Sequence, residues 1–342
     1  MPRSIALPPA RHPLRHFAYH LRAAGKRAAG GAPPVPTAGL GRRWGLPIEV
    51  RVMAAEDRMA TGTIIAASDL TPLSREVAGR ALALGRRMSA RVILVHALPD
   101  GTSEARVQAA REALEQALAA AGGSGAGPGG APPQPSPRAE VRVLTGPPDI
   151  AIRSVCLAEG GVLVLLGLHR FRRVLDMLRL TTMERIVLRA PVPVLIAHTP
   201  VTRDYGTVLA STDFAPACAA ALAAAARVAS PGAQFHAIHA LQLGLRDKFS
   251  HGGVSASRAM TRAEAMCRAF LAMPGVPAGL HPPEIVVGGV HEVLAFRLEE
   301  LRPDLLAIGT HSGRDPETLG NYARDLMREP PTDVIVTKPP PL

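Results

Sequence analysis

The sequence is poor in three features that would each point to a class of protein. It has three cysteines in 342 residues, and none lies in a C-x-x-C pair, which argues against a disulfide framework or a zinc site. No run reaches the roughly 18–20 apolar residues that span a bilayer. Aromatic residues make up 3% of the chain, so its cores must be built from Ala, Val, Leu and Ile. We therefore expect a cytoplasmic protein without a transmembrane segment, with Cys156, Cys218 and Cys267 in its core.

Acidic residues are missing from the start of the chain, where none precedes Glu49. Residues 1–58 hold ten Lys or Arg and three Asp or Glu, a net +7 of the chain's +11. Residues 59–342 hold 29 basic and 25 acidic residues, so their charge does not argue for specific nucleic-acid binding. We expect residues 1–58 to be a disordered basic tail or a start assigned too early. The alternative is a targeting peptide or a membrane-surface helix.

What is present is an alternation of strand-like and helix-like runs that occurs twice in the same order. The strand-like runs are short, apolar and β-branched, and the runs between them have apolar residues at helical spacing. Strands are expected at 63–67, 91–97, 141–144, 161–166 and 194–198, and again at 207–211, 234–240, 284–287, 305–308 and 334–337.

Matching residues of the two copies are separated by a nearly constant distance in the sequence. The separation is 144, 143, 142 and 140 residues for the pairs Asp69 and Asp213, His96 and His239, Gly167 and Gly309, and Val194 and Val334. Such a constant offset predicts a duplicated domain of about 140 residues. We expect domains at 59–200 and 201–342, with a flexible Gly/Pro-rich insert at 122–138 in the first.

The alternation also predicts how each domain is built. Continuous apolar strands separated by helices are typical of a parallel sheet that is covered by helices on both faces. Ligands of such sheets bind beyond the carboxyl ends of the strands. Polar residues and glycines follow those ends in both copies, and we expect them to converge there: Asp69, His96, Gly146 and Gly167 in the first, and Asp213, His239, Gly289 and Gly309 in the second.

A loop that begins Gly-x-His follows the fourth strand of each copy, and a helix follows the loop. Glycines that allow close approach, backbone N–H groups and a helix N-terminus are the parts of a phosphate site. The first loop runs from Gly167 through His169 and Arg170 to Thr181-Thr182. The second is made of Gly309, His311, Ser312, Gly313, Gly320 and Asn321 with the residues between them.

With these loops the chain resembles the universal stress protein family, over about residues 62–200 and 206–338. The resemblance implies a five-stranded parallel sheet in each domain and domains that pair through their last strands. It also implies a G-x2-G-x9-G-[S/T] loop that holds the phosphates of ATP or AMP, and an Asp after the first strand that contacts the adenosine. A regulatory stress-response protein is therefore expected, with an adenine nucleotide as its ligand and no metal site.

Neither loop has the full motif of the family. The first has the family's spacing, but Arg170 and Leu180 stand in place of the second and third glycines. The second has Gly309, but Ser312 stands in place of the second glycine with Gly313 next to it, and the loop is two residues short before Gly320-Asn321. Either the arginines of the first loop hold an anion through their side chains, or they form a solvated basic loop: Arg170, Arg172, Arg173 and Arg179.

The resemblance gives fifteen candidate nucleotide-binding residues. They are Asp69, Ala97, Gly167, His169, Arg170, Thr181 and Thr182 in the first copy, and Asp213, Ala240, Gly309, His311, Ser312, Gly313, Gly320 and Asn321 in the second. For the two aspartates the alternative role is favourable charge at a helix N-terminus. For the histidines of the loops it is shaping of the loop. His96 and His239 end strands and are expected to be core residues.

Two other functions are weighed against nucleotide-dependent regulation. The first is an interaction scaffold in which both sites are relics of the same fold. The second is an ATP-using ligase or thiolation enzyme, which needs a Ser-Gly-Gly-x-Asp-Ser type loop after the first strand. Residues 67–71 and 211–215 do not match that loop. We therefore predict no catalytic residues and leave weak ATP hydrolysis open, with either a homodimer or an intramolecular pseudo-dimer of the two domains.

Overall fold

The computed structural model describes the chain from residue 62 to residue 339 with six gaps. The described residues are 62–71, 74–122, 137–168, 180–201, 203–243, 254–310 and 319–339. The tail at 1–58, most of the Gly/Pro-rich insert and part of both Gly-x-His loops lie outside these ranges. Five candidate site residues therefore lie outside the described residues: His169, Arg170, His311, Ser312 and Gly313.

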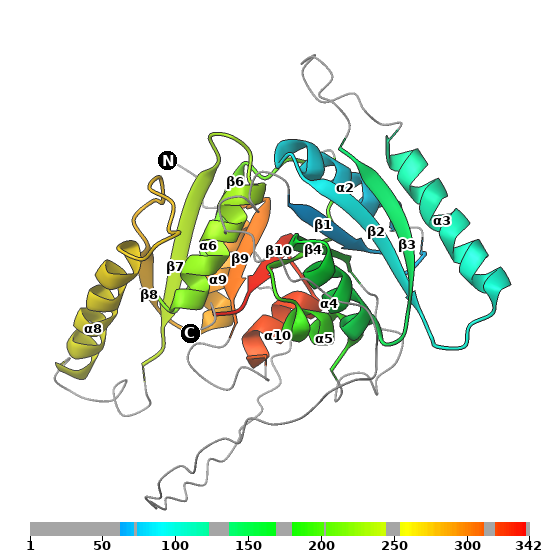
Figure 1. Ribbon diagram of the computed structural model, residues 1–342. Coiled ribbons are helices and arrows are strands. Elements are labelled where there is room, and N and C mark those ends of the chain that lie inside the picture. The colour runs from blue at the N-terminus through cyan, green and yellow to red at the C-terminus, as the bar shows by residue number, and fades with distance from the viewer. Residues whose placement is uncertain are drawn as a thin grey trace, which may run out of the picture. The chain divides into compact units, whose positions relative to one another are not determined.

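Ten described strands form one sheet, in two halves of five (Figure 1). The first half is β1 (Thr63–Ala67), β2 (Arg91–Leu98), β3 (Ala139–Thr145), β4 (Gly161–Gly167) and β5 (Val194–Ala197). The second half is β6 (Thr207–Ser211), β7 (Gln234–Leu241), β8 (Glu284–Val287), β9 (Leu305–Gly309) and β10 (Asp333–Thr337). The order across the sheet is β3-β2-β1-β4-β5-β10-β9-β6-β7-β8. The predicted α/β architecture is thereby confirmed.

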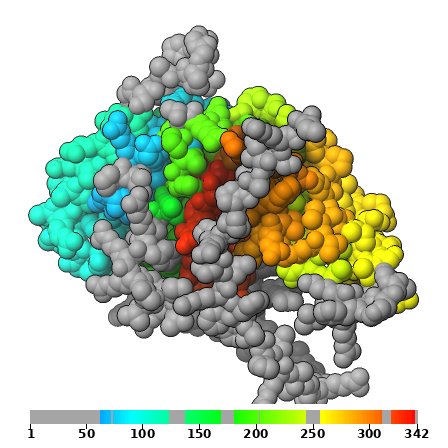
Figure 2. Space-filling view, turned by 180° about the vertical axis from the view of Figure 1, so that it is seen from behind, coloured from blue at the N-terminus to red at the C-terminus, as the bar shows by residue number. Residues whose placement is uncertain are grey.

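The strands of each half are parallel, and the two halves meet at one antiparallel pair. In that pair Ile335 of β10 lies opposite Leu195 of β5. We call this junction the seam. In Figure 2 the red C-terminal segment lies between green segments of the first half and orange segments of the second, as the strand order requires. Because β5 and β10 run in opposite directions, the carboxyl ends of the two sets of strands lie at opposite edges of the sheet.

Eight described helices cover both faces of this sheet. One face carries α2 (Ser74–Arg87), α3 (Glu104–Gly122), α6 (Pro216–Val228) and α8 (Val254–Leu271). The other carries α4 (Pro148–Ala158), α5 (Thr182–Arg189), α9 (Val290–Leu301) and α10 (Asn321–Arg328). Both halves belong to one compact unit, Val52–Leu342.

Alternate residues of the strands enter two separate cores. In β1, Ile64 and Ala66 pack into the core under α2 and α6, whereas Ile65 packs into the core under α4 and α5. Successive side chains of a strand point to opposite faces, so a strand covered on both sides must be apolar throughout. This explains why the strands are continuous apolar runs in the sequence.

The three cysteines lie in these cores as free thiols, as expected. Burial raises the pKa of the Cys156 thiol to about 11 and that of Cys218 to about 12, so both stay protonated at neutral pH. No helix among the described residues is long and apolar enough to cross a membrane.

A buried ionic network crosses the seam. Arg80 of α2 is 2% exposed, and its guanidinium lies 3.5 Å from the carboxylate of Asp333 at the start of β10, which is fully buried. Asp333 also accepts hydrogen bonds from the Tyr205 hydroxyl (2.6 Å) and from the backbone N–H groups of His198 and Thr199 (2.9 and 2.8 Å). The guanidinium of Arg80 stacks over the Tyr205 ring at 4.7 Å. The segment that joins the two halves is thereby fixed to both of them.

Candidate functional site

An aspartate turn follows the first strand of the first half. Oδ1 of Asp69 accepts hydrogen bonds from the backbone N–H of Thr71 (3.0 Å) and from its hydroxyl (2.7 Å). Leu70 between them has φ +59° and donates its N–H to the Ser68 hydroxyl at 3.0 Å. A left-handed leucine is uncommon, so the turn is held by these bonds rather than by local preference.

The second half repeats the turn with different side chains. Oδ1 of Asp213 accepts from the backbone N–H of Ala215 (3.0 Å) and lies 3.2 Å from the Cys218 thiol. Phe214 has φ +64° and donates its N–H to the Thr212 hydroxyl at 2.8 Å. In both halves the carboxylate is therefore fixed at the carboxyl end of the strand, just before a helix.

His96 and His239 hold these two turns in place. Nδ1 of His96 lies 2.8 Å from the Ser68 carbonyl oxygen, and Nδ1 of His239 lies 2.8 Å from that of Thr212. A carbonyl oxygen can only accept, so Nδ1 carries the proton in both rings. The sequence interpretation made these histidines core residues and missed the hydrogen bond. The sequence offered a signal for this hydrogen bond, because His96 and His239 occupy equivalent positions on the strands next to those that precede Asp69 and Asp213.

The glycines that end β4 and β9 differ in what surrounds them. A Cβ on Gly309 would lie 2.5 Å from the Ala217 carbonyl carbon and 2.6 Å from the Cys218 backbone nitrogen, both in the first turn of α6. A Cβ on Gly167 would meet a methyl group of the Val77 side chain at 2.9 Å. Gly309 is therefore required for the close packing of a helix against its strand, whatever its role toward a ligand.

The helix that follows the first loop is capped by the protein's own side chains. The Thr181 hydroxyl accepts from the backbone N–H of Glu184 (3.2 Å), and a Glu184 carboxylate oxygen accepts from the backbone N–H of Thr181 (2.6 Å). This is a capping box, which satisfies two of the free N–H groups at the start of a helix. The candidate residues Thr181 and Thr182 thus begin α5, and a carboxylate already occupies that end. The Thr-x-x-Glu sequence at 181–184 was a visible signal for it.

Arginines of the second half neutralise this carboxylate. Glu184 is fully buried, and it accepts from Nε of Arg324 (3.1 Å) and Nε of Arg328 (2.9 Å), both on α10. Burial alone would raise the pKa of Glu184, but the hydrogen bonds from Arg328, from the backbone of Thr181 and from Arg324 bring it below its ordinary value. The start of α5 therefore holds a stable internal anion.

The corresponding helix of the second half has no such cap. Its N-cap residue is Gly320, with φ −60° and ψ 144°, and no side chain of the described residues bonds to it. The first turn of α10, which begins at Asn321, contains no acidic residue. Its backbone N–H groups and the positive end of its dipole can therefore receive an anion.

The topology places the described candidates at the two expected edges. In the first half Ala97, Asp69 and Gly167 stand at or just beyond the ends of the neighbouring strands β2, β1 and β4. In the second half Ala240, Asp213 and Gly309 stand at or just beyond the ends of β7, β6 and β9. Gly320 and Asn321 begin α10, the helix that follows β9, so all five residues belong to one edge of the sheet. Among the described residues no group of three or more His, Cys, Asp or Glu could hold a metal ion.

The strand order defines a doubly wound α/β fold, an architecture in which ligands generally lie beyond the carboxyl ends of the strands. Residues 61–198 match the model of the universal stress protein family, and this part of the chain is a universal stress protein domain. No curated protein sequence matches the chain.

Solved structures resemble the chain across both halves. One is a universal stress protein from Archaeoglobus fulgidus DSM 4304, with a TM-score of 0.55 and 19% identity, covering 81% of this chain and 96% of that one. Another is a functionally unknown protein from Pseudomonas aeruginosa PAO1, with a TM-score of 0.54 and 20% identity, covering 83% of this chain and 95% of that one. At these identities the likeness establishes the fold.

Proposed function

We propose that the chain is a stress-response regulatory protein that binds one adenine nucleotide, ATP or AMP, in its second half. In this proposal the two domains span 59–200 and 201–342, and the protein works in the cytoplasm without a catalytic step. The observation that carries the proposal is the difference between the starts of α5 and α10. The first is filled by the Glu184 carboxylate, and the second has no acid and no side-chain cap among the described residues.

The proposed site assigns a role to each candidate of the second half. The backbone N–H groups that follow Gly320 would bind phosphate oxygens, because a helix N-terminus favours negative charge. Asp213, fixed by its turn, would contact the adenosine, as the family resemblance implies. The candidates His311, Ser312 and Gly313 lie in the sequence between Gly309 and Gly320 and would complete the proposed phosphate contacts.

For the first half we favour the alternative function, an interaction scaffold that binds no nucleotide. A phosphate at the start of α5 would be placed beside the Glu184 carboxylate, and two like charges at one helix end repel each other. We infer that the first half serves as a structural partner. Through Arg324 and Arg328 it fixes the helix on which the second site depends.

Calorimetric titration of ATP and of AMP into the full chain tests this proposal. We expect one nucleotide bound per chain. The decisive variant is Gly320→Asp, because a Cβ at Gly320 would meet nothing within 4 Å and its φ of −60° suits any residue. The new carboxylate should cap α10 and weaken nucleotide binding at least tenfold.

The matched control is Gly320→Asn, which has the same shape as the aspartate variant but no charge. It should bind nucleotide within about threefold of the original chain, since asparagine also caps helices. Two nucleotides per chain, no heat at submillimolar nucleotide, or equal binding by the aspartate and asparagine variants would each contradict the proposal.

A further inference from the structure

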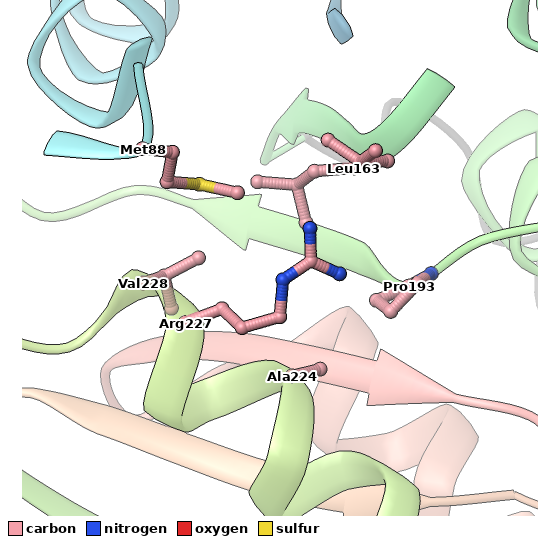
Figure 3. A pocket seen from close by; sticks show the side chains of 7 residues that line it. Met88, Leu163, Pro193, Ala224, Arg227 and Val228 are labelled. Atoms are coloured by element: carbon pink, nitrogen blue, oxygen red, sulfur yellow. The ribbon is translucent and has the colours of Figure 1, made fainter. Parts of the chain in front are cut away.

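A small hollow lies at the seam, beside the last turn of α6. Figure 3 shows Arg227 of that helix reaching toward Leu163 and Pro193 of the first half, with Met88 and Val228 nearby. The hollow has a volume of about 10 Å³, which is room for about one water molecule, and most of the side chains around it are apolar. A charged ligand therefore needs a different place on the molecule.

Two histidines lie side by side at the amino edge of the second half. His236 is near the start of β7, and His281 lies just before β8. The backbone N–H of His281 donates to the Phe235 carbonyl oxygen at 2.9 Å, and Phe235 forms a β-bridge with Leu280. The two imidazole rings are stacked, with centroids 4.4 Å apart and planes that differ by 7°. Backbone pairing therefore holds the two rings together.

The ring pair lies on the face of the sheet that carries α9. Phe235 packs into the core on the other face, and successive side chains of a strand alternate between the faces. His236 therefore points toward α9, and His281 stacks on it there. His281 is exposed and His236 is half-buried. Neither ring has a hydrogen bond with a residue that the structure describes, so ring nitrogens are available to an external ligand.

The charges around the ring pair favour a cation. Arg297 of α9 pairs with Glu284 at the start of β8 and with Glu300 at 2.5 Å. One arginine and two glutamates give these three groups a net charge of −1. Burial lowers the pKa of His236, and the charges of His281 and Arg297 lower it further. The His236 ring is therefore neutral at neutral pH, which is the form of imidazole that binds metals.

The spacing of the rings suits a shared metal ion. Metal–nitrogen bonds to histidine are about 2.0–2.1 Å long, so two nitrogens on one ion lie at most about 4 Å apart. Rings that are stacked at 4.4 Å can reach this span by a small tilt. We propose that His236 and His281 together bind one divalent transition-metal ion of the class that prefers imidazole, with water as its other ligands. Among these ions Cu²⁺ should bind most tightly and Zn²⁺ less so.

The proposed metal site is separate from the proposed nucleotide site. The rings lie at the amino edge of the second half, whereas Asp213 and Gly320 lie at its carboxyl edge. In the first half the offset of 143 residues places Ile93, a buried core residue, at the position of His236. The second half alone therefore has this pair.

Binding of Cu²⁺ to the full chain tests the proposal. The chain has 12 histidines, so the number of ions bound at one buffered Cu²⁺ concentration is compared between variants. His281→Ala should bind one ion fewer per chain, because the remaining ring loses a partner that strand pairing keeps at high effective concentration. The control His291→Ala removes an exposed histidine of α9 and should bind as many ions as the original chain.

A second variant shows whether the two rings share one ion. His236→Phe keeps an aromatic ring in the stack and should also bind one ion fewer. The double variant of His236→Phe and His281→Ala should again lose one ion, and a crystal soaked in Cu²⁺ should give an anomalous peak at the rings. The proposal is overturned by an unchanged ion number in His281→Ala, by a loss of two ions in the double variant, or by an equal loss in His291→Ala. A peak without a difference in ion number marks an adventitious ion only, and it overturns the proposal as well.

Discussion

The two halves of the sheet have the same strand order, the same aspartate turn and the same histidine support, yet they differ at one helix start. In the first half Thr181 and Glu184 close the end of α5 with side chains. In the second half Gly320 leaves the end of α10 without a side-chain cap among the described residues. Equal topology therefore does not give equal helix ends, because one start holds an internal carboxylate and the other has neither an acid nor a side-chain cap among the described residues.

The largest effect is expected at the seam. Asp333→Asn removes the charge that pairs with the buried Arg80, and an uncompensated buried charge costs about 3–5 kcal/mol of unfolding free energy. Urea denaturation measures the loss. The control Asp204→Asn breaks the exposed pair with Arg87 and should cost about 0–1 kcal/mol. Equal losses in the two variants would mean that the buried network does not hold the halves together.

The glycines that end β4 and β9 give the next largest difference. Gly309→Ala forces a methyl group into the backbone of α6, and overpacking of this kind costs about 1–3 kcal/mol. Gly167→Ala meets a methyl group of Val77, which can rotate away, and should cost less. Both variants can be compared by urea denaturation. A larger loss for Gly167→Ala would reverse our account of the two positions.

Acid should weaken the contact between α5 and α10. The folded-state pKa of Glu184 lies below its ordinary value of 4.5, so its contribution is fully present above that pH and is lost as the pH falls through the folded-state pKa. Glu184→Gln should lower the unfolding free energy at pH 7 by about 1–3 kcal/mol, because the acceptor of two arginines loses its charge. The difference between this variant and the original chain should shrink below about pH 4. A difference that stays constant from pH 7 to pH 3 would contradict the assigned ion pairs.

The smallest effects are expected at the two helix caps. Thr181→Ala removes the cap of α5 and should cost about 1 kcal/mol, whereas Gly320→Ser adds a cap to α10 and should gain a few tenths of a kcal/mol. Thermal unfolding without nucleotide measures both. A loss in Gly320→Ser would indicate that the start of α10 is less accessible than we infer.

Much of the fold could be predicted from local sequence, and the reason is visible in β1 and β6. Both strands begin and end where their apolar β-branched runs do, because a strand buried on both faces leaves no polar position inside it. The Thr-x-x-Glu cap of α5 was likewise readable, since all of its atoms lie within four residues.

The residues that contact the candidate site from distant parts of the chain could not be predicted from local sequence. Glu184 is 140 residues from Arg324, and no local pattern announces a bond over that distance. Gly309 was interpreted from a phosphate motif, but the atoms that demand a glycine there belong to α6, far earlier in the sequence. Such contacts arise from the arrangement of helices on the sheet, which periodicity alone does not give.

The antiparallel pair of β5 and β10 determines how the junction of the two halves responds to protein concentration. Both strands belong to one polypeptide, so each finds the other at an effective concentration that the tether fixes. Two separate chains joined through the same strands would come apart on dilution, and their melting temperature would depend on protein concentration. The junction of this protein should persist at any dilution, so a cell that makes few copies obtains the same assembled sheet as one that makes many.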